Sequence, residues 1–321
     1  MTDESPGLNQ REQEPRPGRE QGQQRVPPVR TYRQPARRIR LSVFSLAVSV
    51  VALIVAGIAL FFALRKDDER SVPPDPPPEE ETGTFRFGDK LLTPMEGMPL
   101  NSYDKAAFGL DGKGRVTYEV DGRRAKTGID VSSHQKDIDW RAVAADGIDF
   151  AIIRLGRRGY TEGGLFPDGT FAQNLQGALD AGVEVGVYFF SQAVTPQEAE
   201  EEADFVLEAL SGREQTFLVA YDWENIPGDD ARTDGLSGAE MTRCAAAFCK
   251  RIKAGGFRPA VYFNRTQGYL RYDLRELEEY ELWLAEYGTA PDFYYHFDLW
   301  QYSQSGKVDG IEGDVDLNLA F

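Results

Sequence analysis

Histidine and cysteine are scarce in this sequence of 321 residues, which contains two of each. Cys244 and Cys249 stand five positions apart in a predicted helix, and this spacing turns their side chains about 140° apart around the axis. A disulfide between them is therefore geometrically unfavourable, so we expect two buried free thiols and exclude a disulfide-stapled scaffold. His134 and His296 are too few for a multi-histidine metal site. We predict neither a metal nor a cofactor.

Positive charge is also in short supply after the N-terminal region. The formal net charge is −16, but residues 1–40 hold nine arginines against five acidic residues and residues 65–70 are balanced. Residues 71–321 therefore carry −20. Nucleic acid is not a predicted partner, because its phosphates require a basic face. Internal repeats and a glycine-rich phosphate loop are absent from the sequence, and nothing in it indicates an oligomeric state.

The segment 41–64 contains no charged residue and is apolar throughout. As a helix it would be roughly 36 Å long, enough to cross a hydrocarbon core of about 30 Å. A buried core helix would not be apolar on every face over this length, and a cleaved signal peptide would have a shorter apolar region nearer the N-terminus. We therefore predict a transmembrane helix at 41–64, with the lipid bilayer as a partner.

The segments on either side of this helix predict its orientation. Residues 1–40, rich in Gln, Pro, Arg and Glu, cannot bury enough apolar surface to fold, and they predict a disordered tail. Five arginines within residues 30–40 place this tail in the cytoplasm and the following domain on the cell-wall side. Residues 65–84 form a proline-rich, acidic spacer. In extended form, its last 14 residues would hold the next domain some 40 Å from the bilayer, at about 3.1 Å per residue.

Strands and helices are predicted from residue 85 onward. Two short strand-like runs, 84–87 and 116–120, lie among turn signals and predict a small β appendage over 85–125. After it, apolar runs predict eight strands at 128–132, 149–156, 183–191, 216–222, 259–264, 281–287, 297–303 and 314–319. Helices are predicted at 140–145, 171–181, 196–210 with Thr195 as N-cap, 239–254, and more weakly within 264–280. This α/β order favours a TIM-like barrel with degenerate final units, a doubly wound open sheet being the structural alternative.

A pair of carboxylates ends the fourth predicted strand, in the stretch TFLVAYDWEN at 216–225. Asp222 and Glu224 lie two residues apart, so in a strand they share one face with Cα atoms roughly 6.5–7 Å apart. A strand end running into solvent would explain them equally simply. However, Asp130 and Asp316 occupy the corresponding positions of the first and last strands, which are neighbours in a closed barrel. Functional groups of α/β barrels gather at this end of the strands, so we name these four acids as catalytic candidates.

Aromatic and polar side chains mark the ends of several other strands. Core packing explains any one of these aromatics, but their convergence with carboxylates is typical of a carbohydrate site, where sugar rings stack on aromatic faces. The candidate substrate-binding residues are Tyr188, Phe190, Tyr262, Trp283, Glu286, Tyr287, Gln301 and Tyr302.

Six segments resemble the ordered motifs of glycoside hydrolase family 25, the Chalaropsis-type lysozymes or N-acetylmuramidases. They are GIDVSSHQKDIDW, VGVYFFSQA, FLVAYDWEN, AVYFN, LWLAEY and LWQYSQSGKVDGIEGDVDLN, and they extend over about 126–321. The resemblance implies a catalytic barrel of five β/α units followed by three strands. Lys136 stands where the family often has glycine, and the third strand reads YFF where many members read YHF.

The resemblance also implies residue roles. Glu224 corresponds to the general acid, and Asp222 to the carboxylate that stabilises the positive charge of the transition state or a substrate-derived oxazolinium. Asp130 and Asp316 correspond to the two further acids of the site. Site tyrosines and sugar-groove residues are matched by Tyr188, Tyr262, Trp283 and Tyr302.

The predicted function is hydrolysis of the β-1,4 bond between N-acetylmuramic acid and N-acetylglucosamine in peptidoglycan glycan strands. Crowding by Asp222 is expected to raise the pKa of Glu224, so that Glu224 holds its proton and Asp222 stays ionised. A chitinase-like enzyme is disfavoured, because Ala220 stands where its DxDxE motif needs the first aspartate. The serious alternative is a catalytically inactive, membrane-tethered wall-binding module on the same fold. A tethered enzyme is suited to cell-wall turnover or trimming of nascent glycan.

Overall fold

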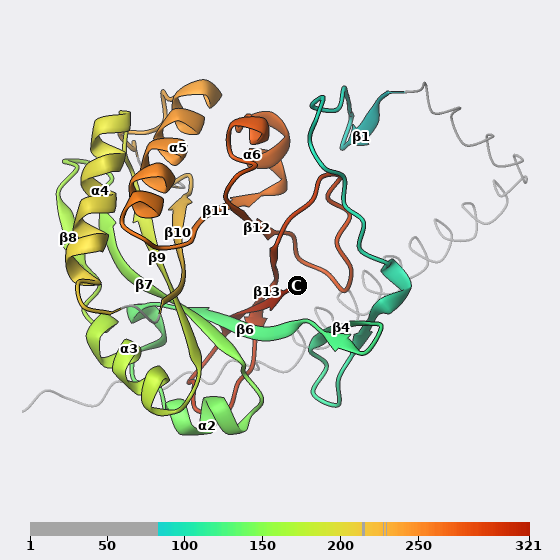
Figure 1. Cartoon of the computed structure of the whole chain (residues 1–321), viewed down its shortest axis with the longest axis vertical. Coiled ribbons are helices and arrows are strands. Elements are labelled where there is room, and N and C mark those ends of the chain that lie inside the picture. The colour runs from blue at the N-terminus through green and yellow to red at the C-terminus, as the bar shows by residue number, and fades with distance from the viewer. Residues whose placement is uncertain (1–82, 214–215, 227, 229) are drawn as a thin grey trace, which may run out of the picture. The chain divides into compact units, whose positions relative to one another are not determined.

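The structure is a computed structural model that describes residues 83–213, 216–226, 228 and 230–321 (Figure 1). The predicted tail at 1–40, the predicted transmembrane helix at 41–64 and all but the last two residues of the predicted spacer lie outside the described residues. In the part that is described, no helix has the length and apolar character needed to cross a bilayer.

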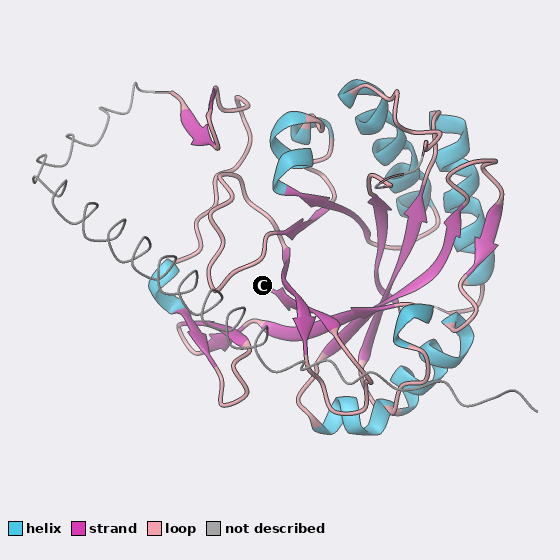
Figure 2. Ribbon diagram, turned by 180° about the vertical axis from the view of Figure 1, so that it is seen from behind, coloured by secondary structure: helices cyan, strands magenta, loops and turns pink. Residues whose placement is uncertain are grey.

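Eight strands form a closed barrel that is mostly parallel (Figure 2). In chain order these strands are β6 Lys126–Val131, β7 Phe150–Arg158, β9 Glu184–Ser191, β10 Thr216–Trp223, β11 Pro259–Asn264, β12 Glu281–Ala285, β13 Leu299–Gly306 and β14 Val315–Ala320. The last strand, β14, is antiparallel to both of its neighbours, β13 and β6, and the pairing of β6 with β7 completes the ring. The open-sheet alternative is therefore excluded.

A helix follows each of the first five barrel strands, and these helices pack on the outside of the barrel. They are α2 Trp140–Ala145, α3 Phe171–Asp180, α4 Pro196–Ala209, α5 Gly238–Ala254 and α6 Arg265–Leu270, the last followed by the 3-10 turn η3 Leu274–Glu276. The predicted N-cap is confirmed, because the Thr195 hydroxyl accepts a hydrogen bond from the backbone N–H of Glu198. From Glu281 to the C-terminus, a fully described stretch, the chain forms strands and no helix.

Two layers of apolar side chains fill the fold because side chains alternate across each strand. The layer between barrel and helices is the larger, and it contains both cysteines as buried free thiols, as predicted. The smaller layer fills the barrel interior with side chains that include Phe150, Ile152 and Leu218. Gly128 of β6 makes room there, since a Cβ at this position would lie 2.2 Å from the Phe150 ring.

Residues 85–125 form two small β units that pack on the barrel (Figure 1, teal). The first is a hairpin of β1 Phe85–Phe87 and β2 Lys90–Leu92, with the Phe85 ring stacked 4.3 Å from that of Tyr294. The second is a three-stranded sheet of β3 Phe108–Leu110, β4 Val116–Val120 and β5 Arg123–Arg124, preceded by the 3-10 turn η1 Lys105–Ala107. The hydroxyl of Tyr103 donates to the carbonyl of Phe297 at 2.6 Å, and this bond ties the segment between the two units to the residues before β13.

Candidate active site

The four candidate acids line one pocket at the carboxyl end of the parallel strands. Asp130 belongs to β6 and Asp316 to β14, where the two are direct partners in the strand register. Asp222 belongs to β10, and Glu224 follows one residue after that strand. The pocket has a volume of about 180 Å³. Its other lining residues are Tyr188, Tyr262, Trp283, Tyr287, Gln301 and Gln304.

Asp130 is held by two amide side chains whose orientations are fixed in turn by aromatic donors. Its Oδ2 accepts from Gln301 Nε2 at 2.9 Å and from Asn318 Nδ2 at 2.8 Å. The Tyr262 hydroxyl donates to Gln301 Oε1 at 2.9 Å, and Trp283 Nε1 donates to Asn318 Oδ1 at 2.9 Å. An indole nitrogen only donates, so the Asn318 carbonyl must face Trp283 and its NH₂ group must face Asp130. The carboxylate of Asp130 is thus stabilised in place.

A proton is shared between Asp130 and Asp316. Burial raises the pKa of both carboxyls, and the two side chains hydrogen-bond to each other. The pKa of Asp316 rises to about 8 through burial, then through the charge of Asp130 and the bond that it makes to it. The amide groups of Asn318 and Gln301 lower the pKa of Asp130 and so oppose the effect of its burial. Asp316 is therefore the protonated member near pH 7, and it donates to Asp130.

The pKa values of the other two acids, Asp222 and Glu224, are raised mainly by burial. Burial raises the pKa of Asp222 well above its usual range, followed by the charges of Glu224 and Asp130, while Arg154 acts in the opposite direction. Its Oδ1 is buried without a hydrogen-bond partner among the described residues. The pKa of Glu224 is raised first by burial and then by Asp130. Desolvation, rather than the expected crowding by Asp222, is therefore the main cause, and in this form of the pocket Asp222 competes with Glu224 for a proton.

Comparison with known sequences decides the family. The model of glycosyl hydrolases family 25 matches residues 129–311, more than half of the chain. The chain belongs to this family.

Individual proteins are also similar to this chain. Lysozyme M1 of Streptomyces globisporus is 30% identical over 201 residues, which cover 60% of this chain and 66% of the relative. The autolytic lysozyme of Clostridium acetobutylicum is 30% identical over 192 residues, which cover 60% of this chain and 54% of the relative. The chain thus spans less than two thirds of either relative's length. Among solved structures, a bacterial lysozyme from Streptomyces coelicolor is similar with a TM-score of 0.51 and 27% identity, covering 60% of this chain and 90% of that one.

Five of the eight candidate substrate-binding residues line the pocket of this family 25 barrel, and three do not. Phe190 pairs with Asp222 in the strand register and is half-buried beside the pocket. The Glu286 carboxylate pairs with Arg265 at 2.9 Å and accepts from the backbone N–H groups of Asp292 and Phe293. Glu286 therefore holds the loop after β12 rather than facing the pocket.

Tyr302 is also turned away from the acids. Its neighbour Gln301 points into the barrel, so strand alternation sends Trp300 and Tyr302 to the outer layer. There the Tyr302 ring lies 5.5 Å from that of Trp300, between barrel and appendage. Tyr302 therefore lies outside the pocket of the four acids but lines the neighbouring hollow, and its place in the sugar groove stays a prediction of the family resemblance.

Three residues in or next to the pocket were not predicted from the sequence. Asn318 could have been found, because it lies two positions after Asp316 in the same strand and so shares its face. Gln304 follows an irregularity of β13 between Gln301 and Ser303, which simple alternation does not predict. Arg154, whose charge acts on Asp222, stands within an apolar strand and is fixed by an ion pair with Asp168 at 2.7 Å.

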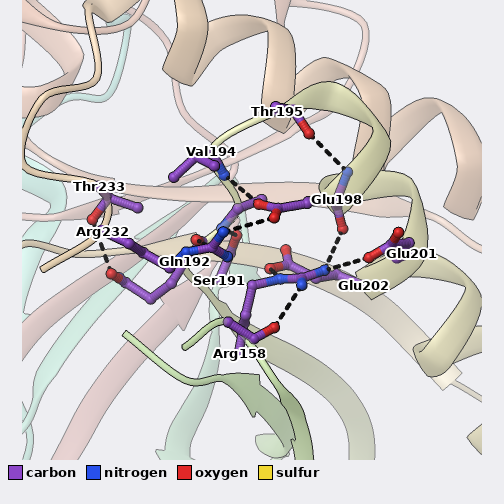
Figure 3. A network of polar contacts seen from close by, with 12 residues as sticks. Arg158, Ser191, Gln192, Val194, Thr195, Glu198, Glu201, Glu202, Arg232 and Thr233 are labelled. Atoms are coloured by element: carbon purple, nitrogen blue, oxygen red, sulfur yellow. Dashed lines mark hydrogen bonds and ion pairs between the residues drawn. The ribbon is translucent and has the colours of Figure 1, made fainter. Parts of the chain in front are cut away.

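A polar network that includes Gln192, Thr233, Arg232 and Glu198, shown in Figure 3, supports the backbone of Glu224. Gln192, which follows β9 directly, donates through Nε2 to the Glu224 carbonyl at 3.0 Å, and its Oε1 accepts from the Thr233 hydroxyl at 2.9 Å. Arg232 pairs with Glu198 of α4 at 2.7 Å. The chain that follows β10 is thus tied to the end of β9 at Glu224 and Thr233, and to α4 at Arg232.

Proposed function

We propose that this chain is a peptidoglycan hydrolase of the lysozyme type, which cleaves the β-1,4 bond between N-acetylmuramic acid and N-acetylglucosamine. The observation that carries the proposal is the convergence of four carboxyls from β6, β10 with its following residues, and β14 in one pocket walled by tyrosine and tryptophan. Membership of glycosyl hydrolases family 25 and the printed names of the two lysozyme relatives support it.

Glu224 is the proposed general acid. Protonation of the leaving oxygen requires a carboxyl that still holds its proton near neutral pH, and burial moves the pKa of Glu224 in that direction. The hydrogen bond from Gln192 to its carbonyl fixes the backbone from which the side chain reaches into the pocket.

Asp222 is the proposed stabiliser of positive charge. Burial together with the neighbouring carboxyls disfavours its ionised form, and Oδ1 has no described hydrogen-bond partner. A sugar ring that develops positive charge, or an acetamido group that donates a hydrogen bond, would supply the missing interaction. Because that interaction strengthens as charge develops, it stabilises the transition state more than the ground state. The Asp130–Asp316 pair, which shares one proton, adds about one further negative charge to the same pocket.

The sharpest test replaces the proposed acid by its neutral isostere. Glu224→Gln should lower the release of reducing ends from purified peptidoglycan by roughly 10²–10⁴-fold, the usual contribution of a general acid. Thermal unfolding should change little, since glutamine keeps the shape of the side chain. Glu208→Gln, on the exposed face of α4, is the matched control. Retained turnover in Glu224→Gln would remove Glu224 from this role, whereas wild-type chain that binds peptidoglycan without releasing reducing ends would establish an inactive wall-binding module.

We further propose that residues 41–64 anchor the enzyme in the membrane, with residues 1–40 in the cytoplasm and the barrel on the cell-wall side. The uncharged apolar length of this segment and the arginines before it support this orientation. An enzyme held there would act in cell-wall turnover or trim glycan strands near the bilayer.

A further inference from the structure

A groove of about 680 Å³ continues from the candidate active site along the side of the barrel. It shares two lining residues, Tyr287 and Gln304, with the pocket of the four acids. The two hollows therefore adjoin each other at these side chains, so a polymer long enough to span them can contact both. Nothing in the family 25 resemblance accounts for it, because one of its walls comes from outside the matched region.

That wall is the turn between β3 and β4, which supplies lining residues from Leu110 to Val116. The family match begins only at residue 129. Arg115 fixes the turn against the barrel: its buried guanidinium donates to the carbonyls of Asp146 and Lys307, at 2.9 and 3.0 Å, and pairs with the Asp146 carboxylate. The appendage is thus held as a rigid side of the groove.

The charge of the groove is opposite to that of the chain around it. Each charged residue that lines it is basic, namely Lys113, Arg115 and Lys307, although residues 71–321 carry −20. The Arg115 guanidinium is buried and bonded to Asp146 and Lys307. The Lys113 and Lys307 side chains, in contrast, are 51% and 72% exposed. Their ion pairs with Asp146 and Asp314 leave them open to solvent on one side. The Lys307–Asp314 pair is exposed at both side chains and contributes little stability, whereas Lys113 is paired with the buried carboxylate of Asp146.

The groove also has apolar walls and an exposed strand edge. Leu110 is 58% and Tyr287 53% exposed, so each offers apolar surface to an occupant. Six consecutive residues, 302–307, line the groove although successive side chains of a strand point to opposite faces, so the groove runs along the edge of β13. The pairing of β13 with β12 ends at Gln301, whereas its pairing with β14 continues to Gly306. An extended peptide is the ligand that fits a strand edge.

We propose that this groove binds the acidic peptide branch of a peptide-bearing glycan, while the glycan itself lies across the four acids. The carboxylates of the peptide would meet Lys307 and Lys113, and its small apolar side chains would lie against Leu110 and Tyr287. The proposal rests on the proposed peptidoglycan hydrolase function and deepens it. The appendage then makes the enzyme selective for glycan that still carries its peptides.

The test compares two substrates prepared from one glycan: purified peptidoglycan strands with their peptides, and the same strands after an amidase has removed the peptides. The full-length chain, purified in detergent, is assayed for reducing-end release below saturation, and the ratio of the two kcat/KM values is the readout. Lys307→Gln and Leu110→Ser each remove one exposed side chain of the groove. Each should lower the ratio by roughly 2–5-fold, as expected for loss of one exposed contact. Lys250→Gln, on the exposed face of α5, should keep the wild-type ratio.

Salt and binding measurements complete the test. Added salt should lower the wild-type ratio towards that of Lys307→Gln, because it screens the lysine. Calorimetry on Glu224→Gln, which should bind without turnover, should show tighter binding of a peptide-bearing muropeptide than of its peptide-free saccharide, and Lys307→Gln should remove the difference. A ratio that neither groove variant alters overturns the groove proposal. If wild-type chain cleaves neither substrate, the proposed function fails, and the calorimetry still decides whether the groove prefers the peptide.

Discussion

Asp316 combines a functional position with a measurable cost in stability. Its pKa is 3.8 when unperturbed and about 8 in the folded chain, so over this interval the folded state holds a proton that the unfolded state has lost. The contribution of Asp316 to the free energy of unfolding then falls as pH rises from about 4 to about 8 and levels off above. Burial that helps to set the charge of the pocket thus weakens the fold at alkaline pH.

Asp316→Asn should remove this pH dependence. Asparagine keeps a donor towards Asp130 but has no proton to lose, so the variant should be more stable than wild type at pH 8.5 by on the order of 1–3 kcal/mol. The advantage should vanish below about pH 3, under the unperturbed pKa of 3.8, where Asp316 is protonated in both states. Chemical unfolding at the two pH values measures it, with Asp314→Asn as a control at an exposed neighbouring position. A stability difference that does not vary with pH would show that Asp316 does not carry the proton.

Gln192 is the second residue with a role that a single substitution can isolate. Its amide joins the backbone carbonyl of Glu224 to the Thr233 hydroxyl and makes no described bond to a carboxyl group of the pocket. Gln192→Met keeps the volume and removes both hydrogen bonds, which should cost about 1–3 kcal/mol of stability. Because Glu224 would also lose its backbone support, kcat should fall roughly 10-fold with little change in KM.

The control for this substitution is Gln176→Met on the exposed side of α3. Kinetics at a temperature where both variants are fully folded separates positioning from stability. A destabilised Gln192→Met chain with wild-type kcat would reduce Gln192 to a purely structural residue.

At the scale of elements, the sequence predicts the barrel well where strands and helices are long. The apolar run at 259–264 and the helix at 140–145 coincide with β11 and α2, because their periodicity extends over at least one full turn or several alternations. The strands β2, β3, β5 and β8 Leu165–Pro167 were not predicted, since two or three residues carry no periodic signal and depend on their partners.

The candidate site shows the same limit at its edges. Asp130, Asp222 and Glu224 follow from the rule that barrel strands present functional groups at their carboxyl ends. Asp316 lies instead at the amino end of β14, which reaches the same pocket because this strand is antiparallel to its neighbours. The direction of the Glu286 side chain does not follow from strand alternation, because β12 ends at Ala285. That of Gln304 does not follow either, because β13 is irregular after Gln301. Where a strand ends or slips is decided by tertiary packing, so sequence alone predicts the strand-borne acids and loses the residues just beyond.

At the scale of the whole molecule, the groove gives the appendage a role in substrate binding. It also bears on how a negatively charged domain can bind a negatively charged polymer. A domain of residues 71–321 with a net charge of −20 is poorly suited to approach an anionic polymer. The basic lining of the groove concentrates positive charge beside the acids, where the polymer would have to bind. Local complementarity can thereby outweigh an unfavourable net charge once salt screens the longer-range field.

The last prediction concerns the proposed membrane anchor at residues 41–64 and its spacer. A spacer that reaches some 40 Å from the bilayer keeps the barrel at the innermost layer of the wall, where its effective concentration on new glycan is high. In a strain that lacks this protein, a secreted form of residues 65–321 should restore wall morphology less well than the full chain, even at equal abundance. Replacing residues 41–64 by an unrelated transmembrane helix should restore function, because only the anchoring matters. Both forms should release reducing ends equally from purified peptidoglycan, which shows that the secreted barrel is folded and active. Equal restoration by the secreted form would mean that position, and with it the proposed role near the membrane, is dispensable.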